Sequence, residues 1–406
     1  MEQENKIQED NLQVEKKLNI GFFIDTFFPM VDGVIVVVDN YARILSQFAN
    51  VTVFTVKGRK KYDDTKLPYK VVRCPAVRLV GLDYDLPLPK LSHKFKRELN
   101  QANLDIVHIH SPFTIGNLGV QYAKKHNIPV IGTMHSQYKK DFLKETHNNN
   151  WLANKLLAKC MKIFNACDEC WAVNDKVGEI YYKEYGAKKM PKTRFNGADL
   201  KPFVDEKEIY RLKKEYDIHD DERVLLFVGR ITVLKNVPFI LQSLKCLKDS
   251  NFKFKMFFIG AGPDMEKMQK LTNALKIDDL VRFLGRITDR EEMEKMYCMA
   301  DLFLFPSLYD CNSLVQIEAA SQSTPTLFLE GAATADTVTP DKNGYVAENN
   351  PKKYADKIID IFKDMKKYNE VSKNAFSDLY HSWDDCVAKA WVDYNKILTE
   401  KKGKHE

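Results

Sequence analysis

Long apolar runs, glycine and proline are all scarce in this chain. Only 17 glycines and 15 prolines occur among 406 residues, which excludes collagen-like and low-complexity chains. No apolar run approaches the roughly 18 residues that cross a bilayer as a helix, so we expect any membrane contact to be peripheral. Residues 1–17 are polar and mostly acidic, and they lack the apolar core of a signal peptide. We expect them to form a disordered tail on a cytoplasmic protein.

Cysteine is present without a pattern. The eight cysteines have no repeating spacing, which argues against a disulfide framework and fits a reducing compartment. The lone C-x-x-C of Cys167 and Cys170 lacks the second pair that a structural zinc site needs. His108 and His110 fall on one face of an expected strand, without an evident third ligand. We therefore interpret all four residues as structural and expect no bound metal.

The chain does have enough apolar side chains to build large cores. Hydrophobic residues make up 44% of the sequence, and 406 residues are more than one core normally serves, so we expect two domains. From residue 18 onward, short apolar runs alternate with helical stretches, which is typical of buried parallel strands in an α/β sheet. The runs are LNIGFFID, VTVFTV, KVVRCP, LDIVHIH, PVIGTMH and ECWAVN, followed by RVLLFVGR, FKMFFIGAG, VRFLGR, DLFLFP and PTLFLE.

This rhythm predicts two Rossmann-like, doubly wound domains, at residues 18–200 and 201–378. Sheets of this kind bind ligands at the carboxyl ends of their strands, so two such domains that face each other place their sites on either side of one cleft. Near the end of the chain, Trp383, Val387, Trp391 and Tyr394 recur at helical spacing. We expect residues 379–400 to form an amphipathic helix.

Positive charge is concentrated in the first half of the chain. Residues 1–200 carry a balance of +8 and residues 201–406 one of −2, and residues 51–100 alone hold 12 basic and 5 acidic side chains. A basic face on one domain indicates an anionic surface as partner. We find no zinc finger, RNP-like motif or helix-turn-helix, so nucleic acid is not the expected partner. Outside residues 51–100, the basic residues that contribute to this balance include five lysines: Lys139, Lys140, Lys144, Lys155 and Lys159.

The segment VGRITVLKN, residues 228–236, is the first candidate for chemistry. A buried strand ends at Gly229, and Arg230 and Lys235 follow it in a loop that precedes a helix. Two cations beside a helix N-terminus form a site for a diphosphate. Taken alone, the alternative is that both are ordinary surface charges.

The second candidate is FPSLYDCNSLVQIEAASQSTP, residues 305–325. Asp310 and Glu318 stand eight residues apart, and a helical stretch begins between them. If Asn312 or Ser313 caps that helix, the backbone N–H groups of Ser313, Leu314 and Val315 are free to bind an anion, with Glu318 one turn deeper. The alternative is that Asp310 is only a cap residue.

The order of these motifs resembles the family-4 retaining glycosyltransferases of the GT-B fold. The resemblance runs from about residue 18 to 398 and rests on GFFIDTFFPMVDGV, DIVHIHSPF, TMHSQY, FNGADLKPF, FVGRITVLKN, FIGAGP, FLGR, ADLFLFPS and DCNSLVQIEA. FIGAGP alone is only a fragment of a dinucleotide fingerprint. The resemblance implies two Rossmann-like domains facing across a cleft, with the last helix returning to the N-terminal domain.

The resemblance also implies a role for individual residues. Arg230 and Lys235 match the cation pair that stabilises the departing nucleoside diphosphate. Asp310 and Glu318 match the E-x7-E motif, with the first carboxylate on the donor sugar and the second on the ribose. His135 matches the histidine that faces the transferred sugar, although a lone histidine at a strand end is more often structural.

Further donor-binding positions follow from the same resemblance. Gly33 would bring a backbone N–H close to the diphosphate, and the backbone of Arg286 and Ile287 would frame the base. The sequence departs from the family at Asp310 in place of glutamate, at Asn312-Ser313 in place of an aromatic-Gly pair, and at Ser323 in place of glycine. These departures leave the identity of the donor sugar open.

The expected activity is transfer of a hexose from a nucleotide-diphosphate sugar, UDP-glucose or a similar donor, to an acceptor hydroxyl with retention. The N-terminal motifs are most similar to the diacylglycerol glucosyltransferase branch, so the expected acceptor is a membrane glycerolipid such as diacylglycerol. The nucleotide sugar is a substrate, and no cofactor or obligatory metal is expected. We expect the enzyme on the inner face of the membrane, bound peripherally to its anionic surface. The alternatives are a polysaccharide or oligosaccharide-lipid acceptor, or a non-catalytic relative that binds nucleotide or glycan.

Overall fold

The structure is a computed structural model that describes residues 17–78, 85–199 and 205–403, without the side chain of residue 402. Almost all of the expected tail at 1–17 and the expected domain boundary at 200/201 lie outside the described residues. The chain divides into two compact units. The first takes the described residues of Met1–Thr133, Ile163–Glu169 and Trp391–Glu406, and the second those of Met134–Lys162 and Cys170–Ala390.

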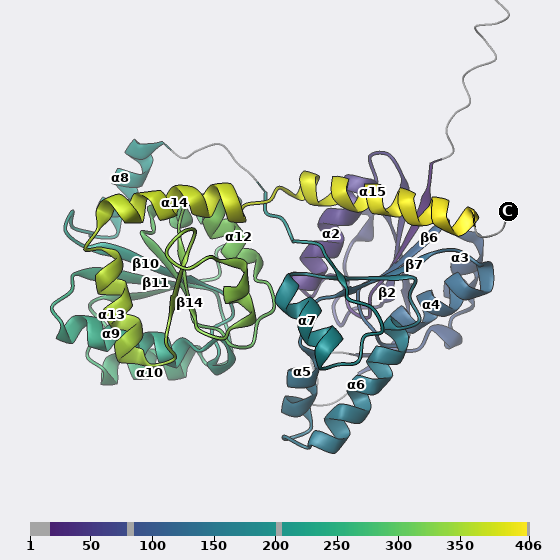
Figure 1. Cartoon of the computed structure of the whole chain (residues 1–406), viewed down its shortest axis with the longest axis horizontal. Coiled ribbons are helices and arrows are strands. Elements are labelled where there is room, and N and C mark those ends of the chain that lie inside the picture. The colour runs from purple at the N-terminus through teal and green to yellow at the C-terminus, as the bar shows by residue number, and fades with distance from the viewer. Residues whose placement is uncertain (1–16, 79–84, 200–204, 404–406) are drawn as a thin grey trace, which may run out of the picture. The chain divides into compact units, whose positions relative to one another are not determined.

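The first sheet is parallel and doubly wound (Figure 1). It has seven strands in the order β3-β2-β1-β6-β7-β8-β9. Strand order reverses between β1 and β6, which makes that position the topological switch point. The strands are β1 Asn19–Phe23, β2 Asn50–Val56, β3 Lys70–Cys74, β6 Ile106–Ile109, β7 Val130–Met134, β8 Glu169–Ala172 and β9 Lys192–Thr193, and a separate antiparallel hairpin joins β4 Ala76–Arg78 to β5 Asp85–Pro87.

The helices of this half of the sequence alternate with its strands, as expected for crossover connections. They are α2 Gly33–Leu45, α3 His93–Gln101, α4 Thr114–His126, α5 Tyr138–Glu145, α6 Asn150–Phe164 and α7 Asp175–Lys183, with short 3₁₀ turns η1 Asp64–Lys66 and η2 Pro89–Leu91.

The second sheet has six parallel strands in the order β12-β11-β10-β13-β14-β15. Its switch point lies between β10 and β13. The strands are β10 Arg223–Val228, β11 Phe254–Ile259, β12 Val281–Gly285, β13 Leu302–Phe305, β14 Thr326–Leu329 and β15 Tyr345–Ala347. The helices are α8 Glu206–Glu215, α9 Val237–Asp249, α10 Met265–Ala274, α11 Arg290–Met299, α12 Leu314–Ser321, α13 Pro351–Ile361, α14 Met365–Leu379 and α15 Trp383–Lys402, with 3₁₀ turns η3 Val233–Lys235 and η4 Ala333–Thr337.

The expected α/β architecture is confirmed, because every apolar run named above contains a strand. In β13 and β14 all four residues are buried, as required of strands that are covered on both faces. The sequence did not reveal β4, β5, β9 and β15, which are two or three residues long and have no continuous apolar run. Within the described residues, no helix combines the length and the apolar character needed to cross a membrane.

The carboxyl ends of β10 and β11 approach each other closely. A Cβ added at Gly260 would lie 1.9 Å from the carbonyl oxygen of Gly229, and Gly260 has a φ of +134°. Only glycine fits such a position. The backbone N–H of Gly229 donates to the Ile259 carbonyl at 2.9 Å. This hydrogen bond holds the first residue of the loop that carries Arg230 against β11.

The end of α15 packs on the first unit, which confirms the expected return of the C-terminal helix. The hydroxyl of Tyr394, which is fully buried, lies 2.7 Å from Nδ1 of His108 on β6. The Trp391 ring meets the edge of Phe48 at a centroid distance of 4.8 Å. His108 Nε2 lies 2.6 Å from the Thr133 hydroxyl, so both ring nitrogens have partners and the structural interpretation of this histidine is supported.

Candidate functional site

The switch point of the second sheet brings the two candidate loops together. Strands β10 and β13 are neighbours, so the loop after β10 and the loop after β13 leave the same edge of the sheet side by side. The amide of Asn236 joins them by donating to the Pro306 carbonyl at 3.1 Å. The sequence predicted both loops separately, and parallel pairing of their strands places them at one site.

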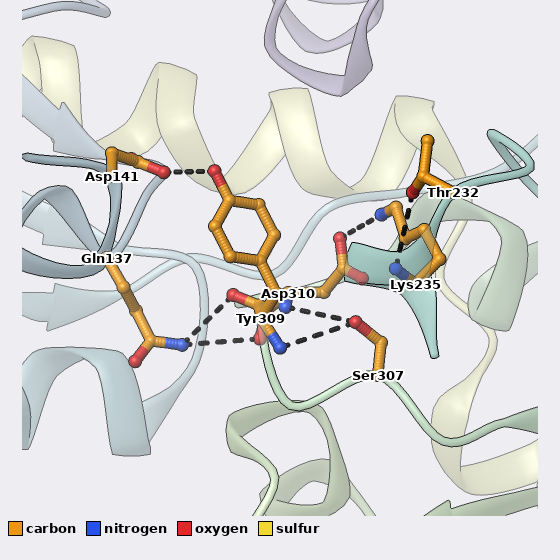
Figure 2. A network of polar contacts seen from close by, with 7 residues as sticks. All are labelled: Gln137, Asp141, Thr232, Lys235, Ser307, Tyr309 and Asp310. Atoms are coloured by element: carbon orange, nitrogen blue, oxygen red, sulfur yellow. Dashed lines mark hydrogen bonds and ion pairs between the residues drawn. The ribbon is translucent and has the colours of Figure 1, made fainter. Parts of the chain in front are cut away.

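Lys235 and Asp310 form an ion pair across these loops (Figure 2). The Thr232 hydroxyl caps the 3₁₀ turn η3 by accepting from the Lys235 backbone N–H at 3.3 Å. The Lys235 ammonium lies 5.8 Å from the ring centre of Phe305, which favours a cation at this position. Arg230 lies at the carboxyl end of β10 with its side chain exposed. The structure thus places Lys235 beside the expected sugar-binding carboxylate.

One oxygen of Asp310 is left for a ligand. Among the described residues, Oδ2 of Asp310 is buried and has no hydrogen-bond partner, whereas Oδ1 binds Lys235. An unsatisfied buried acceptor costs roughly 1–3 kcal/mol, which a hydroxyl donor from a sugar would relieve. The Ser307 hydroxyl accepts from the backbone N–H groups of Tyr309 and Asp310 at 3.3 and 3.4 Å. Asp310 is therefore held by its loop, and it is not the cap of the following helix, whose N-cap residue is Ser313.

A set of residues at the start of α5 holds the same loop from the other side, and Figure 2 shows part of it. The Gln137 amide donates to the carbonyls of Tyr309 and Asp310 at 3.3 and 3.4 Å. The Lys140 ammonium donates to the Leu308 carbonyl at 2.8 Å, and the Tyr309 hydroxyl donates to Asp141. None of these contacts was predicted from the sequence. The signal in the sequence was that Gln137 lies within the motif TMHSQY, and that Lys140 and Asp141 follow it closely.

His135 lies between β7 and α5 and is buried. Burial lowers its pKa from 6.5 to about 3, because a charged ring is poorly solvated there. The imidazole is therefore neutral throughout the physiological pH range. Its expected position facing the transferred sugar stays a prediction.

We expect this buried histidine to make the protein less stable in acid. Its pKa is lowered in the folded state, so below pH 6.5 the unfolded chain binds a proton that the folded chain rejects, and stability is lost as the pH falls. Between pH 7.5 and 5.5 the free energy of unfolding of the native protein should fall by roughly 1 kcal/mol more than that of His135→Gln. Urea unfolding at both pH values measures this. An identical pH dependence of the two proteins would contradict the burial of a neutral imidazole.

Glu318 on α12 is held by two residues of α11. The Arg290 guanidinium donates to Oε1 at 2.7 Å, and the Tyr297 hydroxyl donates to Oε2 at 2.8 Å. Burial, with the carboxylate beside it, raises the pKa of Tyr297 well above its ordinary value, so its hydroxyl remains a donor. Each carboxylate oxygen keeps further acceptor capacity. The structure thus orients Glu318 through Arg290 and Tyr297, neither of which lay in a recognisable motif.

The helix between the two carboxylates begins as expected. Ser313 is the N-cap residue of α12, although its side chain makes no capping bond. Its carbonyl accepts from the Gln316 backbone N–H at 3.1 Å. The first-turn N–H groups of Leu314 and Val315 point along the helix axis toward its N-terminus. The anion-binding role expected for residues 313–315 stays a prediction.

The end of α12 explains one departure from the family pattern. Ser323 has a φ of +60°, in the left-handed region that favours glycine. The N–H groups of Ser323 and Thr324 donate to the carbonyls of Ala320 and Ala319 at 2.9 and 3.0 Å, which is the hydrogen-bond pattern of a Schellman motif. The serine therefore adopts, at a conformational cost, a left-handed conformation that glycine adopts more readily.

Ser323→Gly should accordingly stabilise the protein by roughly 0.5–1 kcal/mol, because relief of the left-handed strain exceeds the added freedom of the unfolded chain. Urea unfolding measures the effect. Ser321→Gly in the last turn of the same helix is the matched control, and it should destabilise by about 0.5 kcal/mol. Equal shifts for both variants would contradict the argument.

Three further residues were expected to bind the nucleotide sugar: Gly33, Arg286 and Ile287. Gly33 is the first residue of α2 in the first unit, and a Cβ added there would meet no atom within 4 Å. Asp32 caps that helix by accepting from the Ile35 N–H at 2.9 Å. Arg286 is exposed after β12, whereas Ile287 packs against the core of the second sheet. If Ile287 contacts the base, it therefore does so through its backbone atoms.

Both halves of the chain match known protein families. Residues 31–201 match the family described as Glycosyltransferase Family 4, and residues 208–378 match Glycosyl transferases group 1.

Curated relatives cover most of the chain. The alpha-monoglucosyldiacylglycerol synthase of Acholeplasma laidlawii is 26% identical over 378 residues, which are 88% of this chain and 92% of that protein. The synthase of the same name from Streptococcus pneumoniae is 26% identical over 318 residues, which are 76% of this chain and 70% of the relative.

Solved structures share the whole fold. The HepE protein of Anabaena, in a crystal structure with UDP, superposes with a TM-score of 0.74 at 15% sequence identity, over 95% of this chain and all of that one. At this identity the superposition establishes the fold, and the fold is GT-B.

Proposed function

Because this chain belongs to family 4 of the GT-B glycosyltransferases and is a hexosyltransferase, we propose that it moves a hexose from UDP-glucose or a similar nucleotide-diphosphate sugar to a membrane glycerolipid such as diacylglycerol. The transfer retains the anomeric configuration. The enzyme works at the inner face of the membrane as a peripheral protein.

The pair formed by Lys235 and Asp310 is the observation that carries the proposal. A glycosyl donor has an anionic diphosphate on one side of the bond that breaks and a hydroxyl-rich sugar on the other. Lys235 supplies a fixed cation, and the adjacent Asp310 supplies one buried oxygen without a partner. One site thus holds a binding group for each side of the same bond.

In the proposed reaction, Lys235 and Arg230 take up the charge that grows on the diphosphate as the glycosidic bond breaks. Charge stabilisation of this kind is worth most in a site that is organised beforehand. Asp310 accepts a hydrogen bond from the sugar, and Glu318 accepts one from the ribose. His135 stays uncharged and presents a neutral ring to the sugar. Because two cations neutralise the leaving group, the proposed transfer needs no metal.

The acceptor assignment is supported by the relatives and by the charge of the chain. Two relatives that cover most of the chain are named alpha-monoglucosyldiacylglycerol synthases. The balance of +8 over residues 1–200 suits an enzyme that finds its acceptor in an anionic bilayer.

A donor and acceptor panel tests the proposal. Purified protein is incubated with UDP-glucose, UDP-galactose or GDP-mannose and with diacylglycerol in detergent, a soluble oligosaccharide or no acceptor, and both nucleotide release and glycolipid are scored. We expect diacylglycerol-dependent release of UDP that survives a chelator. If sugar is transferred to the oligosaccharide and not to diacylglycerol, the proposed lipid acceptor is wrong and the acceptor is a glycan. Binding of UDP without release from any donor would overturn the enzymatic assignment.

A further inference from the structure

Helix α6 carries charge of one sign and an exposed tryptophan. Its 15 residues include Lys155, Lys159 and Lys162 and no aspartate or glutamate. Trp151, in the first turn, is 70% exposed, and Leu152 beside it is 37% exposed. Figure 1 shows α5 and α6 as a helical hairpin, and Trp151 follows the connecting residues 146–149.

The outward side of α6 is distinct from the side that packs. Inward positions at helical spacing are buried, as listed here: Ala153, Leu157, Cys160, Met161 and Phe164. Trp151, Lys155 and Lys159 follow each other at intervals of four residues and are exposed, so they form one stripe. The helix therefore already has a packed face, and its tryptophan belongs to the other one.

The exposure of Trp151 is unusual within this protein. Trp171 is 1% exposed and Trp383 is 5% exposed, as expected for so large an apolar ring. The Lys155 ammonium lies 4.9 Å from the ring centre of Trp151. This contact holds the lysine along the ring but leaves the indole accessible.

An indole flanked by lysines suits one chemical environment in particular. Tryptophan prefers the boundary between acyl chains and headgroups, where its ring is apolar and its N–H stays hydrated. Lysine stems extend along an apolar surface and place their charge among anionic headgroups. A protein partner with an acidic groove would match the lysines, but charged residues are depleted at the centre of protein interfaces. An anionic bilayer explains both the exposed tryptophan and the lysines beside it.

We propose that the stripe of Trp151, Lys155 and Lys159, with Leu152 beside it, docks on an anionic lipid bilayer, with the Trp151 indole inserted at the headgroup boundary. This inference rests on the proposed glycerolipid acceptor, and it assigns the bilayer contact to one face of one helix.

Vesicle binding tests the inference directly. The vesicles are phosphatidylcholine with or without phosphatidylglycerol, and the proteins are the native chain, Trp151→Ser, and Lys155→Gln with Lys159→Gln. We expect each variant to lose at least tenfold in affinity for the anionic vesicles. Val392→Ser with Lys396→Gln is the matched control, because Val392 is 64% exposed on α15 and Lys396 is one turn away. The control should bind as the native protein does.

Tryptophan fluorescence gives a second readout that does not depend on affinity. Insertion of Trp151 should shift the native emission to the blue on adding anionic vesicles, and Trp151→Phe should abolish the shift. Native-like binding by both α6 variants, or a shift that survives in Trp151→Phe, would overturn the inference.

Failure of the inference is separable from failure of the proposed function. Transfer to diacylglycerol dispersed in detergent should be unchanged in the α6 variants, because none of their residues lies in the donor site. If the native enzyme glucosylates diacylglycerol in detergent but the α6 variants bind vesicles normally, the docking face is wrong and the function stands. Vesicle binding that depends on Trp151, without transfer to any lipid, supports the docking face and overturns the acceptor.

Discussion

Lys235→Ala is expected to lower turnover by a factor of about 10² to 10³, the usual result of removing one group that stabilises charge in a transition state. Lys235 is the last residue of η3, and its ammonium group forms an ion pair with Asp310. The charge on the diphosphate grows as the bond breaks, so turnover should fall more than affinity for UDP. Initial rates at saturating donor and calorimetric titration with UDP measure the two quantities.

Lys245→Ala is the matched control for this variant. Lys245 lies on α9, ten residues further along the chain, and pairs with Asp249 near the surface. Its loss should change neither turnover nor UDP affinity, since surface pairs of this kind contribute little. Turnover within threefold of the native enzyme in Lys235→Ala would refute the assignment of Lys235 to the leaving group.

Glu318→Gln is expected to weaken binding of UDP itself by a factor of about 10 to 100. The change removes the charge that Arg290 and Tyr297 hold in place, and a hydrogen bond to a charged group contributes roughly 1.5–3 kcal/mol. The effect should appear with UDP alone, because the ribose is present whichever sugar is attached. Asp310→Asn should leave UDP affinity within about threefold and lower only transfer.

Glu292→Gln on α11 is the control for the carboxylate, because Glu292 is exposed there. It should bind UDP as the native protein does. Thermal unfolding of all three variants shows whether loss of binding reflects loss of fold. If a well-folded Glu318→Gln binds UDP normally, Glu318 is a structural partner of Arg290 and the ribose is held elsewhere.

The fold was predictable because buried parallel strands have a strong local signal. Runs such as RVLLFV and LFLF are apolar without alternation, since both faces of these strands are covered. The short strand β15 has no such signal, and its pairing with β14 depends on contacts made only in the folded chain. The bounds of the two compact units, which include separate segments, are a property of contacts and cannot be read from a linear sequence.

The site was predictable only as far as its residues lie in motifs. Lys235 and Asp310 each stood in a recognisable loop, but their ion pair depends on β10 and β13 being neighbours. Arg290 and Gln137 were missed for a related reason. Each acts on a residue distant in sequence, Arg290 on Glu318 and Gln137 on the carbonyls of residues 309 and 310. Arg290 lies outside every recognised motif. Gln137 lies within TMHSQY, but that motif does not indicate which distant loop its amide contacts.

The return of α15 to the first unit constrains the order in which the chain matures on the ribosome. Tyr394 fills the core beside His108, and Lys401 pairs with Asp168 at 2.9 Å. Until those residues emerge from the exit tunnel, His108 lacks the Tyr394 hydroxyl as a hydrogen-bond partner. The apolar surface of the first unit that the end of α15 covers also stays exposed. The sheet built from β10 to β15 has all its strands by Ala347. We therefore expect the half of the protein synthesised first to be the half completed last.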